Sequence, residues 1–345
     1  MVDGSDTEAV NAVIEKQVDH INVSSADELF EHASSRKPFV VRGAMKDWPL
    51  VKAAQKSNSS ARDYILEFYE GRPCNVFRGH PDAGTHVTYT NDMRLNFESS
   101  FEDLSKIFDD IGESENVTPQ PMIYSGSIEA RKNLPGIAEE NPFTQLPIEA
   151  RYSLWMGTKT RIPAHSDYTD NFACVAAGRR HFIIFPPEQY ENLYLGPMHN
   201  TPAGRQISMV DFAEPDFEKF PRFKVALENA FQVTLDPGDL IFIPSMWWHQ
   251  IEGLDRFNVL VNYWWHIDGS HLGEPEHALW HALWSIRDLP AEKRAFWKKL
   301  FDAHVFDDGG DLFDHVPEGY RGIHSKLNPK TGGFIRRYLQ DRLIK

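Results

Sequence analysis

The sequence predicts a mainly β protein with flanking helices, in which an antiparallel sandwich or barrel forms the centre. Short runs rich in β-branched and aromatic residues follow one another closely from about residue 152 to residue 265. Ala177-Gly178 separates two of these runs, and Asp236-Pro237-Gly238-Asp239 separates two others. Apolar residues recur at helical spacing on both sides of this region. Closely spaced strands with tight turns favour an antiparallel arrangement over a sheet built from strand–helix–strand units.

The N-terminal part is expected to combine short helices with one buried strand. The first ten or so residues are small and acidic, so we expect them to fray. Ser24 or Ser25 has the side chain of a helix N-cap, and an apolar run ending at Gly43 is typical of a strand. The expected elements are a helix after Ser25, a strand over 37–43, and helices over 60–70 and 101–111.

The central part holds the candidate strands and one long polar insertion. The segment 195–224 is polar and contains several prolines, so we expect it to lie over one face of the core. The candidate strands span residues 152–156, 172–176, 181–185, 232–235, 240–243 and 258–265.

The last part of the chain is expected to be helical. His277 and His281 lie four residues apart there, but the glutamate of an HExxH zinc motif is missing, so we expect interface or surface histidines. The helices are expected over 276–287, 291–304 and 332–344. The whole chain is therefore divided into an N-terminal region over 1–120 that packs on the core, a catalytic core over 121–268, and a C-terminal helical region over 269–345.

Composition narrows the class of protein. The formal net charge of −14 disfavours a surface that grips the phosphates of nucleic acids. No apolar run approaches the length of about 20 residues that a membrane-spanning helix needs. The two cysteines, Cys74 and Cys174, form no disulfide framework, and no secretory signal opens the sequence, so a cytoplasmic location is expected.

Two histidines and one aspartate form a candidate metal site. His165 and Asp167 are two residues apart, so on a strand their side chains point to the same face. His249 follows the candidate strand 240–243 and offers a second imidazole from a neighbouring strand. Two imidazoles and one carboxylate on one side of a metal are the facial triad typical of non-haem iron(II) oxygenases. Asn171 would share the same strand face if that strand continues unbroken.

Longer motifs surround these three residues. They are IPAHSDYTDNFACVAAGRRHFIIFPP from Ile162, LDPGDLIFIPSMWWHQIEG from Leu235, NVLVNYWW from Asn258 and, upstream, KPFVVRGAMKDWP from Lys37. Together they resemble the JmjC-type cupin hydroxylases, nearest the branch of the asparaginyl hydroxylase that inhibits hypoxia-inducible factor. The resemblance implies a double-stranded β-helix (cupin or jelly-roll) core. It also implies an iron(II)- and 2-oxoglutarate-dependent dioxygenase that uses O2 to hydroxylate a protein side chain or a small molecule.

The resemblance also implies roles for individual residues. Iron would be held by the three residues named above, and Asn171 and Asn262 would lie beside the cosubstrate and the metal. Tyr124 and Arg180 would bind the distal carboxylate of 2-oxoglutarate. Arg180 stands where the family usually has a lysine, and a guanidinium can bind a carboxylate through two hydrogen bonds. Ile162 stands where a threonine often contacts the cosubstrate, so that contact is missing.

The sequence also offers candidates for the substrate pocket and for a partner chain. Trp248 and Trp264 are candidates for the substrate pocket, where indole rings would shield the reaction. The helix around Trp280 is apolar on more than one side, and the related hydroxylases dimerise through C-terminal helices, so a homodimer is expected. Two alternatives remain for the function: a metal cupin enzyme that does not use 2-oxoglutarate, and a catalytically silent JmjC-like binding module.

Overall fold

The computed structural model describes residues 8–81, 83–144, 146, 150–265, 271–307 and 310–343. The chain divides into one compact unit over Met1–Trp265 and a second over His266–Lys345. Most of the first ten residues, the predicted boundary between 268 and 269, and the predicted helix end at Ile344 lie outside the described residues. The division of the first unit into 1–120 and 121–268 stays a prediction.

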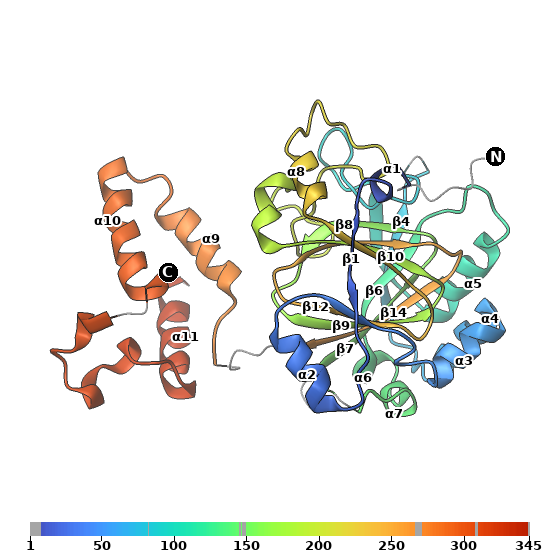
Figure 1. Cartoon of the computed structure of the whole chain (residues 1–345), viewed down its shortest axis with the longest axis horizontal. Coiled ribbons are helices and arrows are strands. Elements are labelled where there is room, and N and C mark those ends of the chain that lie inside the picture. Colours follow the sequence, from blue (N-terminus) through green and yellow to red (C-terminus); the bar gives the residue numbers. More distant parts are fainter. Residues whose placement is uncertain are drawn as a thin grey trace. The chain divides into compact units, whose positions relative to one another are not determined.

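The first unit is built on two β-sheets, drawn as ribbons in Figure 1. The five-stranded sheet has the order β1 (Lys16–Gln17), β11 (Phe231–Leu235), β10 (Arg180–Phe185), β13 (Trp248–Gly253), β8 (Arg161–Ser166). The nine-stranded sheet has the order β2 (Asp19–His20), β3 (Phe39–Val41), β12 (Leu240–Ile243), β9 (Asp170–Ala177), β14 (Asn258–Trp265), β7 (Arg151–Gly157), β6 (Ile123–Glu129), β4 (Cys74–Gly79), β5 (Phe97–Glu102).

Nearly all neighbouring strands are antiparallel, and only the short β1 and β2 pair in parallel with β11 and β3. Helices flank the sheets in the first unit at α1 (Glu8–Asn11), α2 (Ala26–Ser34), α3 (Pro49–Lys56), α4 (Asn58–Leu66), α5 (Leu104–Ser114), α6 (Ala130–Asn133), α7 (Ile137–Glu140) and α8 (Phe223–Glu228). The predicted fold class, mainly β with flanking helices around a cupin-like core, is confirmed.

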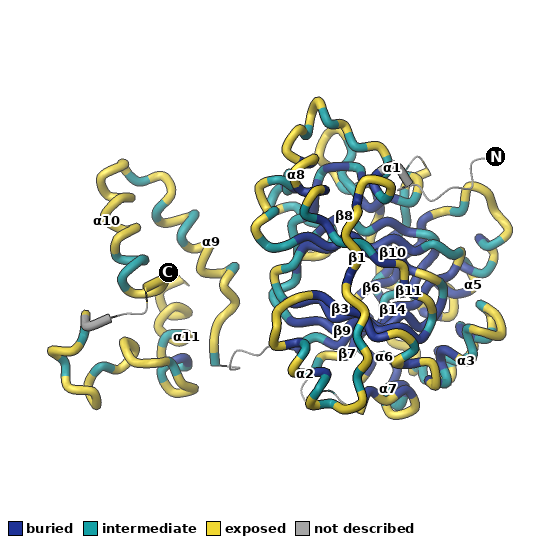
Figure 2. The backbone as a smooth tube through the Cα atoms, in the orientation of Figure 1, coloured by how far each residue is buried: buried dark blue, intermediate teal, exposed yellow. Residues whose placement is uncertain are grey.

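Two apolar clusters explain why the central strands are apolar on both faces. Every residue of β9 is buried. Ala173 and Val175 face the space between the two sheets, where they meet residues of the small sheet such as Phe182. Phe172 and Cys174 face the opposite way, into a cluster with the helices α2 to α5. Because β9 is covered on both sides, its sequence is a continuous apolar run rather than an alternation. Figure 2 shows the same strands as the buried centre of this unit.

The N-terminal helices include one predicted cap and one predicted start that is wrong. Ser25 is the N-cap of α2 and accepts a hydrogen bond from the backbone N–H of Glu28 at 3.2 Å, as predicted. The helix expected from residue 101 is wrong at its start, because Phe101 and Glu102 belong to β5. The helix α5 begins after Asp103, whose side chain accepts from the backbone N–H of Ser105. An aspartate N-cap thus marks the boundary that the apolar spacing alone misplaced.

The segment 195–224 packs on the outer face of the five-stranded sheet. Val210, Phe212 and Phe223 share an apolar cluster with Phe185 of β10 and Trp248 of β13. The backbone joins this contact, since the N–H of Ser208 donates to the carbonyl of Ala164 at 2.8 Å. The segment therefore covers one face of the sheet that carries both candidate histidine ligands.

The second unit is helical, as predicted. Its helices are α9 (Pro275–Ser285), α10 (Ala291–Phe301) and α11 (Pro329–Leu343), with short helical turns at Asp302–Phe306, Gly310–Phe313, Glu318–Tyr320 and Gly322–His324; a further 3-10 turn, Pro187–Asn192, lies in the first unit. Large apolar side chains remain exposed here, including Trp284 at 76% and Phe296 at 61%. Among the described residues, each helix is too short or too polar to cross a lipid bilayer.

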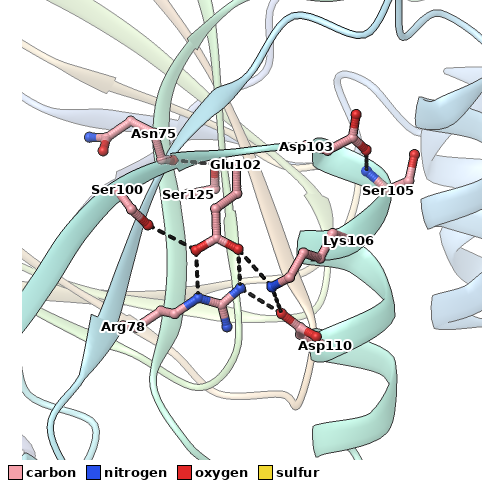
Figure 3. Close-up of polar contacts among 9 residues, drawn as sticks. All are labelled: Asn75, Arg78, Ser100, Glu102, Asp103, Ser105, Lys106, Asp110 and Ser125. Atoms are coloured by element: carbon pink, nitrogen blue, oxygen red, sulfur yellow. Dashed lines mark hydrogen bonds and ion pairs between the residues drawn. The ribbon is translucent and has the colours of Figure 1, made fainter.

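A charged network fastens β4 and β5 to α5, as Figure 3 shows. The Arg78 guanidinium donates two hydrogen bonds to the Glu102 carboxylate, at 2.9 and 2.8 Å, and a further one to Asp110. Lys106 donates to both carboxylates. The Arg78 guanidinium, assisted by Lys106, holds the pKa of the Glu102 carboxyl well below its usual range. The ionised carboxylate therefore stabilises the folded state.

We predict that Glu102→Gln lowers the free energy of unfolding by about 1 kcal/mol at neutral pH, as measured by urea unfolding. Because the folded-state pKa is depressed, this stabilisation is present above the ordinary value of 4.5 and is lost as the pH falls below it. The difference between wild type and variant should then shrink in acid. Glu98→Gln, an exposed position on the same strand, is the matched control. Equal effects of both changes would contradict a specific role of the network.

Candidate metal centre

The two candidate histidine ligands lie directly opposite each other on neighbouring antiparallel strands. His249 of β13 pairs in register with His165 of β8, and their ring centroids are 4.4 Å apart. Asp167 follows the end of β8, and its Oδ2 lies 3.9 Å from Nε2 of His249. The candidate ligand atoms of all three residues lie within 4.8 Å of one another. The structure therefore brings together the three residues that the motif spacing selected.

A bulge on β8 aims His165 at the centre. The register between β8 and β13 shifts between His249 and Ile251, so that β8 has an additional residue around Pro163. Proline has no backbone N–H to donate, and in sheets it is found at bulges and edge strands. β8 is the edge strand of its sheet. A bulge at this position lets Ile162 and His165 both face inward although they are three residues apart.

Hydrogen bonds to the backbone fix which nitrogen of each histidine is free. Nδ1 of His165 lies 2.9 Å from the carbonyl oxygen of Pro163, and Nδ1 of His249 lies 3.1 Å from that of Trp247. A carbonyl can only accept, so each Nδ1 carries the proton and donates. In its neutral form, each ring then presents the lone pair of Nε2, which can bind a metal.

Burial keeps His249 in the neutral form that can bind a metal. Its side chain is 2% exposed, and this burial, together with the neighbouring His165, lowers the pKa of His249 to about 4. The imidazole is therefore unprotonated at neutral pH. Two imidazoles with one carboxylate fit a divalent first-row metal such as iron(II).

The predicted cosubstrate anchor is a buried arginine–tyrosine pair. Arg180, at the start of β10, is 3% exposed, and its Nη2 donates to the carbonyl of Trp155 at 3.1 Å. Its charge acts on the nearby Tyr124, and burial raises the pKa of Tyr124 to about 12, which keeps the phenol protonated as a donor. The neighbouring Arg179 instead pairs with Asp255 and is half exposed. Arg180 is thus the arginine that points into the protein.

Asn171 faces the same interior, but it lies on a different strand from the one that carries His165. The strand carrying His165 does not continue to Asn171, because β8 ends at Ser166 and β9 begins at Asp170 in the other sheet. The parity argument from sequence was therefore wrong. Asn171 nevertheless contacts Asn262, whose Nδ2 donates to its Oδ1 at 2.9 Å.

Several buried polar atoms in this interior have no hydrogen-bond partner among the described residues. They are Nε of Arg180, Oδ1 of Asn262, and the indole N–H groups of Trp155 and Trp264. Burying an unpaired polar group costs on the order of 1–3 kcal/mol, so native structures seldom retain several together without a ligand. These atoms offer both donors and an acceptor, which suits a ligand that carries carboxylate and carbonyl groups.

Of the two tryptophans predicted for the substrate pocket, only Trp264 faces the interior between the sheets. Trp264 faces the interior, where its ring meets that of Trp155 edge to face at 5.6 Å. Trp248 faces the other way, because it is adjacent to His249 on a strand and neighbouring side chains alternate. It packs in the outer apolar cluster and donates to the carbonyl of Pro187 at 3.3 Å. The expectation for Trp248 is therefore corrected.

Trp155 lines the same interior, although the sequence did not single it out. It lies on β7 between Tyr124, whose ring stacks on it at 6.2 Å, and Trp264. Gly126 makes room for it, since a Cβ there would lie 2.6 Å from Cε3 of the indole. Strand alternation from Tyr152 could have placed Trp155 on the inner face, but the sequence does not show which face of β7 meets the metal.

One further contact reaches the metal centre from the segment 195–224. Nε of Arg205 lies 4.0 Å from Oδ1 of Asp167. The Arg205 guanidinium also lies 4.1 Å above the ring of Tyr168. The side of Asp167 away from His249 thus faces a cation.

Comparison with known proteins identifies relatives that match part of this chain. HSPB1-associated protein 1 of Homo sapiens is 34% identical over 131 residues, which are 37% of this chain and 26% of the human protein. Lysine-specific demethylase JMJ31 of Arabidopsis thaliana is 32% identical over 127 residues, 36% of this chain and 22% of the plant protein. tRNA wybutosine-synthesizing protein 5 of Gallus gallus is 28% identical over 204 residues, 57% of this chain and 56% of the bird protein.

The chain therefore spans about a quarter of the length of the first two relatives and about half of the third. A family model described as a cupin-like domain matches residues 25–271, well over half of the 345 residues. That match includes all three candidate ligands and every strand of the two sheets except β1 and β2. The chain belongs to the cupin-like domain family.

Proposed function

We propose that this protein is an iron(II)- and 2-oxoglutarate-dependent dioxygenase that hydroxylates a protein side chain or a small molecule. The observation that carries the proposal is the pairing of two environments in one interior. One is the cross-strand histidine pair with Asp167, in which both Nε2 atoms are free to bind a metal. The other is the buried Arg180–Tyr124 pair, which suits a carboxylate.

The residues would divide the work between binding and orientation. Iron(II) would supply the activation of dioxygen, and three protein ligands leave coordination positions for the cosubstrate and O2. Arg180 and Tyr124 would bind the distal carboxylate of 2-oxoglutarate, and the Asn171–Asn262 pair would orient its other end. The apolar and aromatic surroundings of this interior exclude water from the reacting groups.

The names of the relatives bear on the substrate class. One relative is named as a lysine-specific demethylase and another as a tRNA wybutosine-synthesizing protein. The net charge of −14 disfavours a nucleic-acid substrate for this chain. We therefore favour a protein side chain or a small molecule, and we place the chain near the asparaginyl hydroxylase branch because of the motifs around His165 and His249.

Two properties of the whole protein belong to the same proposal. We expect a cytoplasmic homodimer formed through the C-terminal helices. Support comes from α9 and α10, in which none of the described residues is buried and large apolar side chains such as Trp284 are exposed. The mass of the particle in solution, measured by light scattering, tests the dimer.

We predict that the anaerobic iron(II) protein binds 2-oxoglutarate with a weak visible charge-transfer band, and that Arg180→Ala weakens this binding roughly 10- to 100-fold. The loss follows from removing charge-assisted hydrogen bonds worth about 1.5–3 kcal/mol. Titration of the band measures it. Arg179→Ala, which removes the exposed neighbour, is the matched control and should bind normally.

The outcomes separate the candidate functions. A wild-type protein that holds iron but gives no band would favour a metal cupin enzyme that does not use 2-oxoglutarate. A protein that holds no iron at all would favour a silent binding module. Unchanged binding by Arg180→Ala would refute the anchor and leave the metal centre standing.

We predict that Trp155→Phe weakens 2-oxoglutarate binding roughly three- to tenfold, the value of a neutral hydrogen bond of about 0.5–1.5 kcal/mol. The Cε3 edge of the indole faces Gly126, so the opposite edge with its unpaired N–H points away from β6. The phenyl ring keeps the apolar contacts and loses this donor. The same titration measures the effect, with Trp265→Phe on the opposite face of β14 as control. Equal affinities for Trp155→Phe and wild type would exclude the indole as a donor.

A further inference from the structure

The metal ligands lie on two chain segments that are joined by their backbones. Asp167 lies in the loop between β8 and β9, and His249 follows the turn over 244–247 between β12 and β13. The N–H of Met246 in this turn donates to the carbonyl of Asp167 at 2.7 Å. Because of this bond, the positions of the two segments, and so of the metal ligands that they carry, depend on each other.

Asp170 is the side chain that ties these segments together. It is the first residue of β9, and its side chain is only 2% exposed. Its Oδ1 accepts the backbone N–H of Ser245 at 2.8 Å. Nη1 of Arg36 donates to both of its oxygens, at 2.6 and 2.7 Å, and Nη2 of Arg36 donates to Oγ of Ser245 at 2.9 Å. Arg36 thus contacts both ligand-bearing segments from a third one, between α2 and β3.

The position of Arg36 is maintained at an energetic cost. Its φ is +57°, in the left-handed region that residues with a Cβ seldom adopt. A buried carboxylate needs charged or hydrogen-bonding partners, and without Arg36 the carboxylate of Asp170 would keep the N–H of Ser245. Its remaining charge would draw in water or displace the turn that precedes His249.

We propose that Arg36 is a positioning residue of the metal centre, which acts through Asp170 and Ser245 to hold Asp167 and His249 at the spacing that a metal requires. The inference rests on the metal centre of the proposed function, but not on the identity of the cosubstrate. Neighbouring groups that orient metal ligands commonly change metal affinity by roughly 10- to 100-fold when they are lost.

The chain contains a similar arginine–aspartate pair at the other end of β3. Arg42 follows β3, and its Nη1 lies 2.6 Å from Oδ2 of Asp239. The exposed fractions are 40% for Arg42 and 7% for Asp239, close to the 44% and 2% of Arg36 and Asp170. Asp239 also accepts a backbone N–H, that of Gly43 at 2.8 Å. This pair lies at the start of β12, where Leu240 is opposite Cys174. The turn that leads to His249 follows the other end of β12, where Ile243 is opposite Asn171. The control pair is therefore at the end of β12 away from the ligands.

The experiment compares Arg36→Gln with Arg42→Gln in the full chain. Cobalt(II), which reports its ligand geometry through visible absorption bands, is titrated anaerobically into each protein, and urea unfolding is measured in parallel. We expect Arg36→Gln to weaken cobalt binding about tenfold or more and to change the bands. Arg42→Gln should lose comparable stability, keep an affinity within about twofold of wild type, and leave the bands unchanged.

A milder variant guards against a failure to fold. Ser245→Ala removes only the hydroxyl that Arg36 reaches and should weaken cobalt binding in the same direction, by about two- to threefold. Equal cobalt affinity in Arg36→Gln and wild type, or an equal loss in Arg42→Gln, would overturn the inference. A wild-type protein that binds no metal would overturn the metal centre and this inference together, whereas one that binds cobalt but not 2-oxoglutarate would overturn only the cosubstrate.

Discussion

The metal centre depends on the register in which β13 pairs with β8. With His249 opposite His165, two imidazoles from different strands share one face. Side chains alternate along a strand, so a slip by one residue would turn His249 outward and bring Trp248 or Gln250 inward. The other edge of β13 is fixed by β10, where Ile184 lies opposite His249. The bulge around Pro163 changes the backbone of β8 alone. It therefore sets the direction of the His165 side chain while the other strands of the sheet keep their pairing.

The space between the two sheets combines a packed core with a polar site. Apolar side chains from both sheets, such as Val175 and Phe182, fill part of it. Elsewhere in the same interior, buried polar atoms of Arg180, Asn262 and Trp155 have no partner among the described residues. The apolar packing supplies the stability that lets these groups remain unpaired. Buried polar atoms that have no hydrogen-bond partner therefore indicate where a ligand is expected.

The sequence predicted the elements that have local signals. The Ser25 N-cap, the turn at Asp236-Pro237-Gly238-Asp239 and the apolar runs of β9, β10, β12 and β14 are visible in short windows. Two-residue spacing and a following WWH motif selected the three candidate ligands. The sequence could not show that β8 ends at Ser166 and that Asn171 starts a strand in the other sheet, because that break is set by tertiary pairing. Alternation beside His249 could have placed Trp248 outward. The sequence could not show that Gly126 leaves room for Trp155, since that depends on neighbours distant along the chain.

A crystal structure of the protein grown anaerobically with manganese(II) or iron(II) tests the central claim most directly, because anomalous scattering locates the metal. We predict one metal in the first unit, bound by Nε2 of His165, Nε2 of His249 and one carboxylate oxygen of Asp167. Each Nδ1 should still donate to the carbonyl of Pro163 or Trp247. A metal bound elsewhere, or bound through Nδ1 of either histidine, would contradict the account.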